Sequence, residues 1–222
     1  MNQLKIASVT LAVAASLALS LSARAEDMVR YRAKPIGSMV RIDGVANVHD
    51  WTMEGSLIGG YLEVPANVVL DSSQADVGGV TDGKLKATAD VSIRISSIKN
   101  IHGYEGMDDV MQDAMNASTS PWIKYHVTEM TLKTPHAPGT PFQFDTKGEL
   151  SFNNVTNKVS MPVSITSLDK TKLKISAAAV PVSMADFNVK PPVKLGVFKT
   201  DPGVKISFDW VVGLSAKAGE AK

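Results

Sequence analysis

The sequence predicts an all-β protein, either an antiparallel sandwich or a barrel, interrupted by one amphipathic helix. Apolar residues alternate with polar ones along most of the chain, as they do in strands with one buried face. Turn-forming stretches separate these segments, and there is no rhythm of strand, helix and parallel strand. Only within GMDDVMQDAMNASTSPW, at residues 106–122, do the apolar residues recur at steps of three and four, which indicates a helix.

The first 25 residues have the composition of a secretory signal peptide. Lys5 precedes an apolar run at residues 6–21, and Ser-Ala-Arg-Ala at 22–25 supplies a small-residue cleavage site. The run is shorter than the ~20 residues that a membrane-spanning helix needs, so a retained anchor is the less favoured alternative. We expect cleavage after Ala25, a single domain over residues 26–216, a disordered tail at 217–222 and a periplasmic location.

The composition argues against several classes of protein. Removing residues 1–25, with Lys5 and Arg24, from 222 residues and 23 basic side chains leaves 197 residues with 21 basic against 22 acidic side chains. Such a nearly neutral chain has no basic stripe to meet a phosphate backbone, so we expect no nucleic-acid partner. The chain contains no cysteine, which excludes disulfides, thiolate catalysis and thiolate metal sites.

The predicted strands follow one another with turn signals between them. The strictest alternation is at residues 91–96, VSIRIS, where valine and isoleucine occupy one face and serine and arginine the other. The same period returns at residues 121–132, 142–152, 158–166, 172–182 and 203–214. Turn signals stand at residues 81–84, 133–141, 153–158 and 200–203. Two long connections, 66–83 and 183–196, are predicted at the rims of the sheet, where ligands usually enter.

The predicted helix, from about Gly106 to Ala117, carries an unusual apolar face. Met107, Met111 and Met115 lie along it, whereas Gln112 lies on the other side. Asp108 and its neighbour Asp109 fall in the first turn, where carboxylates favour the positive end of the helix dipole. Methionine adapts to irregular apolar surfaces and to varied ligands. The helix is therefore either an ordinary cap on a core or the floor of a cavity, and the two readings are compatible.

The sequence contains no local motif for catalysis or metal binding. The histidines, His49, His102, His126 and His136, are not spaced as metal ligands on one element. Ser96 and Lys99 match a serine acyl-enzyme spacing, but they end a predicted strand and no companion motif follows. Nucleophile-elbow, P-loop and dinucleotide fingerprints do not occur. We expect neither an enzyme nor a bound metal or cofactor.

Four stretches, in this order and spacing, resemble the YceI-like family. They are GVANVHDWTMEG at 44–55, VSIRISSIKN at 91–100, the helix leading into PWIKYHV at 121–127, and GELSFNNVTNKVSMPVSI at 148–165. The resemblance covers nearly the whole chain after residue 25. It implies a periplasmic, lipocalin-like antiparallel β-barrel of about eight strands, with the helix capping or flooring it, that holds long amphiphilic chains such as polyisoprenoids.

This resemblance predicts an exported binding protein that sequesters or carries a hydrophobic or amphiphilic lipid, isoprenoid or otherwise long-chained. Two alternatives stay open: an enzyme acting on such a lipid, and an envelope stress or structural module whose barrel holds nothing. A symmetric homodimer is also expected. Large apolar side chains of the predicted strands and helix are the candidates for contact with the lipid: Trp51, Met53, Ile93, Ile95, Met107, Met111, Met115, Trp122, Tyr125, Phe144, Phe152, Phe208 and Trp210.

Overall fold

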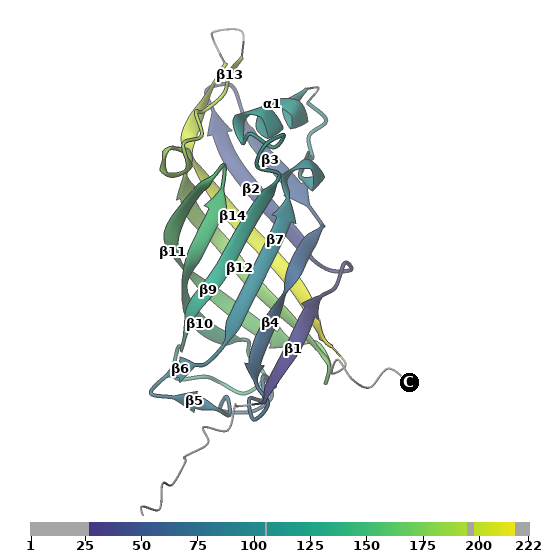
Figure 1. Cartoon of the computed structure of the whole chain (residues 1–222), viewed down its shortest axis with the longest axis vertical. Coiled ribbons are helices and arrows are strands. Elements are labelled where there is room, and N and C mark those ends of the chain that lie inside the picture. Colours follow the sequence, from purple (N-terminus) through teal and green to yellow (C-terminus); the bar gives the residue numbers. More distant parts are fainter. Residues whose placement is uncertain (1–26, 105, 195–197, 216–222) are drawn as a thin grey trace, which may run out of the picture.

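A closed antiparallel barrel of eight strands dominates the structure, a computed structural model that describes residues 27–104, 106–194 and 198–215 (Figure 1). The prediction of a barrel with one α-helix is confirmed. The strands follow one another around the barrel in the order β1 (Met28–Ala33), β4 (Ile58–Pro65), β7 (Thr88–Arg94), β9 (Trp122–Leu132), β10 (Phe142–Phe152), β11 (Val155–Ser167), β12 (Lys172–Ser183) and β14 (Phe198–Leu214). Pairing of β14 with β1 closes the ring.

The long strand β14 also carries a second set of strands. One edge of β14 pairs with β12, whereas the other pairs with β2 (Met39–Ala46) over most of its length and with β1 only near its end. Beyond β2 follow β3 (Asp50–Gly55) and the short β8 (Lys99–Asn100). Between these two regions of β14, where its pairing partner changes from β2 to β1, the hydroxyl of the buried Ser38 accepts a hydrogen bond from the Val211 N–H at 3.0 Å. The same hydroxyl donates to the Lys34 carbonyl at 2.9 Å. The changeover therefore leaves the Val211 amide paired.

Alternation along the strands separates the interior from solvent. In β10 the residues Phe142, Phe144 and Thr146 are buried, whereas the residues between them are exposed. The same period on β9 places Ile123 and Tyr125 on the inner side and the intervening polar residues outside. This agrees with the two-residue repeat read from the sequence. The barrel interior is thus built mostly from every second residue of its strands, with bulges in the β9–β10 and β12–β14 pairs interrupting the alternation.

The two ends of the barrel differ. The helix α1 (Met107–Ala114) and the short β13 (Val193–Lys194) lie at one end, called here the α1 end, and β5 (Val80–Thr81) with β6 (Lys84–Leu85) lies at the opposite end, called the base (Figure 1). Asp82 and Gly83 both have positive φ, 51° and 75°, in the tight β5–β6 turn, as the Asp-Gly signal predicted. Two 3₁₀ turns, η1 (Ile95–Ser97) and η2 (Met184–Phe187), complete the fold.

The described part of the chain contains no helix long and apolar enough to cross a membrane. The predicted signal peptide, residues 1–25, and the predicted tail at 217–222 lie outside the described residues.

Candidate ligand-binding cavity

A cavity of about 480 Å³ occupies the half of the barrel nearest α1. Its volume lies within the range of ~300–1,000 Å³ that small-molecule sites occupy. Most of its lining is aliphatic, aromatic or thioether. The lining residues are Ile42, Ala46, Val48, His49, Trp51, Met53, Tyr104, Met107, Val110, Met111, Ala114, Met115, Ile123, Leu150, Phe152, Val182, Met184, Val189, Pro192, Thr200, Val204 and Ile206.

Helix α1 forms one wall of this cavity through a single face. Met107, Val110 and Met111 line the space together with Ala114 and Met115, as the spacing of three and four requires. Met115, just beyond the helix, is buried, and the residues Met107 and Met111 are half-buried against the core. The methionine face predicted from the sequence therefore does point at the barrel interior. The helix caps the barrel at its α1 end rather than flooring it at the base (Figure 1).

Both ends of α1 are fixed to neighbouring elements. At the start, the Asp108 carboxylate accepts the Asn100 N–H at 2.7 Å and pairs with the Lys99 ammonium at 3.3 Å. At the other end, Asn116 adopts a left-handed φ of 52°, which stops the helix, and donates to the Asn153 side chain at 2.6 Å. Asn153 is itself buried. These bonds hold the apolar face of α1 over the barrel.

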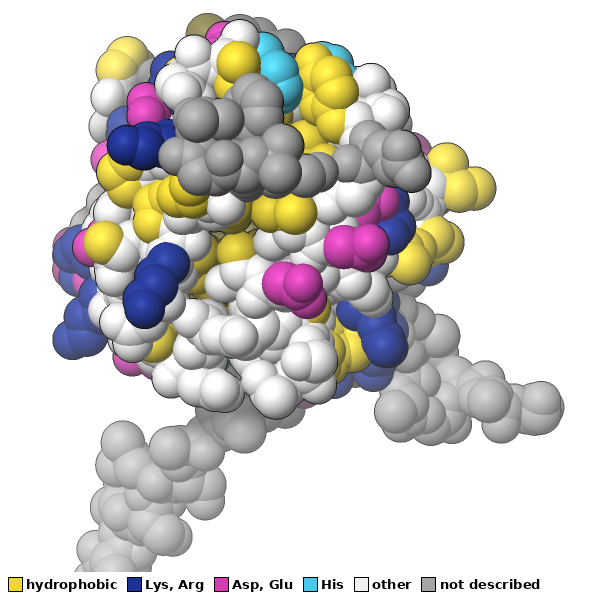
Figure 2. All heavy atoms as spheres, turned by 90° about the horizontal axis from the view of Figure 1, so that it is seen from above, with side chains coloured by type: hydrophobic (Ala, Val, Ile, Leu, Met, Phe, Trp, Pro, Cys, Tyr) yellow, Lys and Arg dark blue, Asp and Glu magenta, His cyan; other side chains and the backbone are white. Residues whose placement is uncertain are grey.

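The cavity opens at the surface beside the β2–β3 turn. Val48 and Tyr104 both line the cavity, yet 54% and 41% of their surfaces are exposed. The His49 ring stacks on the Tyr104 ring with 4.4 Å between centroids. Figure 2 views this end of the molecule, where hydrophobic side chains lie exposed around the middle and histidines lie near the edge. The opening is thus apolar with a polar aromatic pair on its rim.

Polar groups are few within the lining and sit mainly near the opening. His49, Tyr104 and Thr200 supply the ring nitrogens and hydroxyls. Deeper in the wall, the Trp51 ring packs over Gly44, where a built Cβ would lie 2.1 Å from Trp51 Cζ2. The Trp51 indole nitrogen is buried without a hydrogen-bond partner. An apolar interior with a polar rim suits a molecule with a long apolar part and one polar end.

Comparison with known proteins settles the family. A model of the YceI-like domain matches residues 31–212, which is most of the chain. The chain belongs to the YceI-like family. No curated protein is similar enough in sequence to count as a match.

Two solved structures share the YceI-like fold seen here. A polyisoprenoid binding domain from Saccharophagus degradans, implicated in plant cell wall breakdown, is 13% identical, with a TM-score of 0.60 over 83% of this chain and 98% of that one. BcnA from Burkholderia cenocepacia is 17% identical, with a TM-score of 0.56 over 81% of this chain and 98% of that one. At these identities the similarity concerns the fold.

Six of the candidate side chains predicted from the sequence line the cavity of this YceI-like barrel. They are Trp51, Met53, Met107, Met111, Met115 and Phe152. Their contact with a lipid stays a prediction. The remaining candidates lie elsewhere, and alternation along the strands explains the most exposed of them. Trp122 lies next to the inward-facing Ile123, so it points outward, where 40% of its surface is exposed and Arg94 lies 5.7 Å above its ring.

The other candidates face inward but lie outside the cavity. Ile93, Phe144 and Trp210 belong to the main buried core, and Ile95 is fully buried in η1. Tyr125 on β9 and Phe208 on β14 are half-buried against the core. Burial raises the pKa of the Tyr125 phenol. Being apolar and inward-facing is therefore insufficient for reaching the cavity.

Sequence reasoning missed the residues that complete the lining of the YceI-like cavity. Val110 and Ala114 belong to the apolar helical face that the spacing predicted, but they were not among the candidates for contact with the lipid. His49 and Tyr104 come from turns, and Met184 comes from η2 in the long connection after β12. No repeat in the sequence points to these turn residues.

Proposed function

We propose that this YceI-like protein is an exported binding protein that sequesters or carries an amphiphilic long-chain lipid, polyisoprenoid-like, in the cavity beneath α1. The observation that carries the proposal is the cavity of about 480 Å³ with its apolar lining and polar rim. Each methylene removed from water contributes ~0.8 kcal/mol, so apolar walls alone can hold a chain. The structurally similar domain from Saccharophagus degradans is described as polyisoprenoid binding, which supports the same ligand class here.

Binding is favoured over catalysis by the arrangement of titratable groups. Among the described residues that line the cavity, only His49 and Tyr104 have ionisable side chains, and their rings stack on each other at the rim. An enzyme acting on the lipid would need acid and base groups converging on the reacting atoms. A barrel that holds nothing would be filled by side chains, whereas this one leaves a cavity below its helix.

Export is the second part of the proposal. It rests on the charged start, apolar run and small-residue site at residues 1–25. A carrier of hydrophobic molecules has an evident use in the periplasm, an aqueous compartment that lies between two membranes. We propose that the protein works there after cleavage at Ala25.

The test is native mass spectrometry of the protein purified from its own cell envelope without added lipid. The expected spectrum shows the chain together with one lipid-sized adduct, whose mass identifies the ligand and whose complex gives the stoichiometry, including any dimer. Stripping the adduct with organic solvent and adding back the extracted lipid should restore the same complex. A protein that emerges without an adduct and takes up no long-chain lipid contradicts the proposal.

A further inference from the structure

The cavity ends abruptly part-way down the barrel along β2 and β14. Ile42 and Ile206 are paired in register, and both line the cavity. Two residues further toward the base, the next inward-facing pair is Val40 and Phe208, and neither lines it. Val40 is buried, and Phe208 packs against the main core. The deep end of the cavity therefore lies between these two layers.

An aromatic ring closes the opposite wall at a similar depth. Ile123 lines the cavity, whereas Tyr125, the next inward-facing residue of β9, does not. The Tyr125 ring lies over Gly148, where a built Cβ would stand 2.6 Å from Tyr125 Cζ. Its hydroxyl lies 3.4 Å from the Thr146 hydroxyl and 3.5 Å from the Val159 carbonyl oxygen. These contacts hold the ring against β10 and β11. Its register partner Leu150 still lines the cavity, so the cavity reaches this level on β10.

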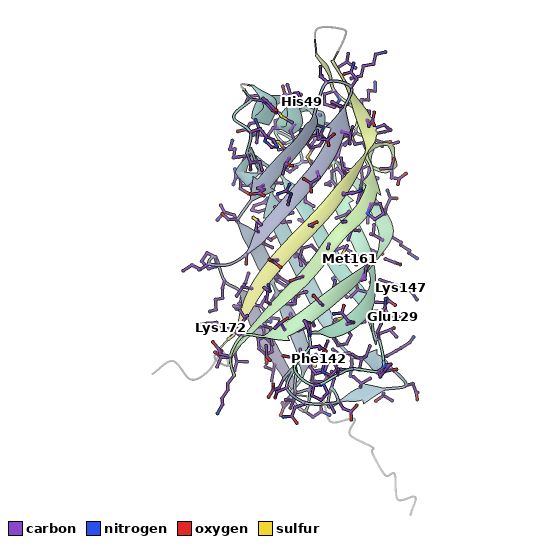
Figure 3. The ribbon with its side chains drawn as sticks, turned by 180° about the vertical axis from the view of Figure 1, so that it is seen from behind. His49, Glu129, Phe142, Lys147, Met161 and Lys172 are labelled. Atoms are coloured by element: carbon purple, nitrogen blue, oxygen red, sulfur yellow. The ribbon has the colours of Figure 1, made fainter. Side chains whose placement is uncertain are left out.

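The barrel below this level is filled with side chains. Phe142 and Phe144 have no exposed surface, and Trp210 is 2% exposed. Figure 3 labels Phe142 near the base and His49 at the α1 end, so the packed region and the cavity occupy opposite halves. Forcing extra atoms into such a core displaces side chains from their rotamers and is unfavourable. A chain that enters from the α1 end cannot thread through to the base.

The size of the cavity then limits how much of a chain fits. A cavity of about 480 Å³ that ends part-way down the barrel can bury only part of a long chain. Among isoprenols, farnesol is shorter than geranylgeraniol, and both are much shorter than solanesol. We propose that Phe208 and Tyr125 act as the stop that limits how much of an isoprenoid chain the protein can bury, so that shorter isoprenoids are taken up in preference to longer ones. This inference rests on the proposed function.

The experiment measures which isoprenols the protein removes from a membrane. Phosphatidylcholine vesicles carrying equal amounts of farnesol, geranylgeraniol and solanesol are incubated with the full mature protein and separated from it. Mass spectrometry then gives the ratio of protein-bound to vesicle-bound isoprenol. Each methylene-sized group that leaves the membrane but does not fit the cavity lowers this ratio roughly fourfold. We expect the ratio of protein-bound to vesicle-bound isoprenol to be roughly tenfold or more lower for geranylgeraniol than for farnesol, and lower still for solanesol.

Three variants test the stop itself. Phe208→Ala deepens the cavity and should raise the geranylgeraniol ratio relative to farnesol by about tenfold. Ile206→Phe fills the deepest cavity layer and should lower the farnesol ratio, so it tests the stop even if the alanine variant fails to fold. Phe144→Ala is the matched control, because Phe144 lies in the packed core and outside the cavity lining. It should lower the melting temperature without changing the preference for chain length.

The outcomes separate the two proposals. Wild-type protein that extracts solanesol as well as farnesol overturns the stop while leaving lipid binding intact. A folded Phe208→Ala variant with an unchanged preference overturns the role of Phe208. If none of the three isoprenols leaves the vesicles, the proposed isoprenoid carriage fails, and the length limit fails with it.

Discussion

Met111 shows how a single side chain can join the helix to the proposed ligand. It lies on the inner face of α1, half-buried, and lines the cavity, whereas its neighbour Gln112 does not. A charge at position 111 would have to lose its hydration beside apolar walls without a partner, which costs several kcal/mol or admits water in place of the lipid. Gln112 is half-buried as well but does not line the cavity, so a charge at position 112 does not face the apolar walls of the cavity.

We therefore predict that Met111→Asp weakens lipid retention far more than Gln112→Asp does. Met111→Leu keeps the volume and apolarity and should cost under about 1.5 kcal/mol of unfolding free energy. Lipid retention and thermal unfolding, measured on all three variants, check this. If Met111→Asp lowers stability and leaves retention by the folded fraction unchanged, α1 is only a cap on the core.

Gly44 determines where the Trp51 ring can lie. The two residues are paired in register on β2 and β3, and the ring edge occupies the space that a side chain at position 44 would fill. A methyl group there would stand 2.1 Å from Cζ2, so the indole must move into the cavity or out of it. Glycine is needed here for close approach rather than for an unusual φ.

We predict that Gly44→Ala destabilises the protein by about 1–3 kcal/mol, the usual effect of overpacking, and changes the tryptophan emission spectrum. The matched control is Gly203→Ala on β14, where a built Cβ meets nothing within 4 Å. Chemical unfolding followed by fluorescence measures both effects. Equal stability of the two variants would show that the Trp51 ring moves aside at little cost in unfolding free energy.

At the scale of the elements, ion pairs on the outer surface tie three strands together. Glu129 on β9 accepts from Lys84 of β6 at 2.9 Å and from Lys147 of β10 at 2.7 Å. Figure 3 shows Glu129 and Lys147 close together on the outside of the barrel. Hydrogen bonds and charge from the two lysines lower the pKa of the Glu129 carboxyl from 4.5 to about 2. The unfolded chain thus binds this proton more readily than the folded one.

The lowered pKa sets the direction of a pH effect. Because the folded carboxyl holds its proton less tightly, the stabilisation by Glu129 is complete above pH 4.5 and is lost as the pH falls toward about 2. We predict that Glu129→Gln melts at a lower temperature than wild type at neutral pH, and that this difference shrinks across that window. High salt should shrink it as well, because the group is at the surface.

Melting curves from neutral pH to pH 2, at low and high salt, test this prediction. Glu149→Gln, which removes an exposed carboxylate on β10, controls for the general loss of one negative charge. A Glu129→Gln difference that stays constant with pH would show that the ion pairs contribute nothing measurable to the stability of the folded barrel.

At the scale of the whole molecule, the described residues form a closed barrel whose two halves differ. The half near α1 contains the cavity, which opens to solvent at the α1 end, and the half near the base is packed with side chains. The proposed function also requires that the protein itself be exported to the periplasm. We predict that the mature protein starts at Glu26, because cleavage follows Ala25 in the small-residue site. Intact mass of the protein recovered from the envelope measures this directly. A species that keeps residues 1–25 in the membrane fraction would show an anchor instead.

The sequence by itself determined the local features of this protein. Alternation at residues 142–152 places Phe142 and Phe144 on one face of β10, since side chains in a strand change face at each residue, and the structure shows this face to be buried. Spacing of three and four placed Met107 and Met111 on one face of α1, because that spacing follows from helix geometry alone. The Asp-Gly turn at residues 82–83 was readable for the same reason: its conformation depends on adjacent residues only.

Only the tertiary structure decided which inward-facing residues meet the cavity. Ile206 and Phe208 share the inner face of β14 and differ by one step of the repeat, yet only the first lines the open space. Alternation gives the face of a strand but not depth along the barrel, which depends on how neighbouring strands are shifted against each other. The cavity lining unites Val48, Tyr104 and Pro192 from distant connections. Closure of the barrel brings these distant residues together, so no repeat along the sequence can predict their contacts.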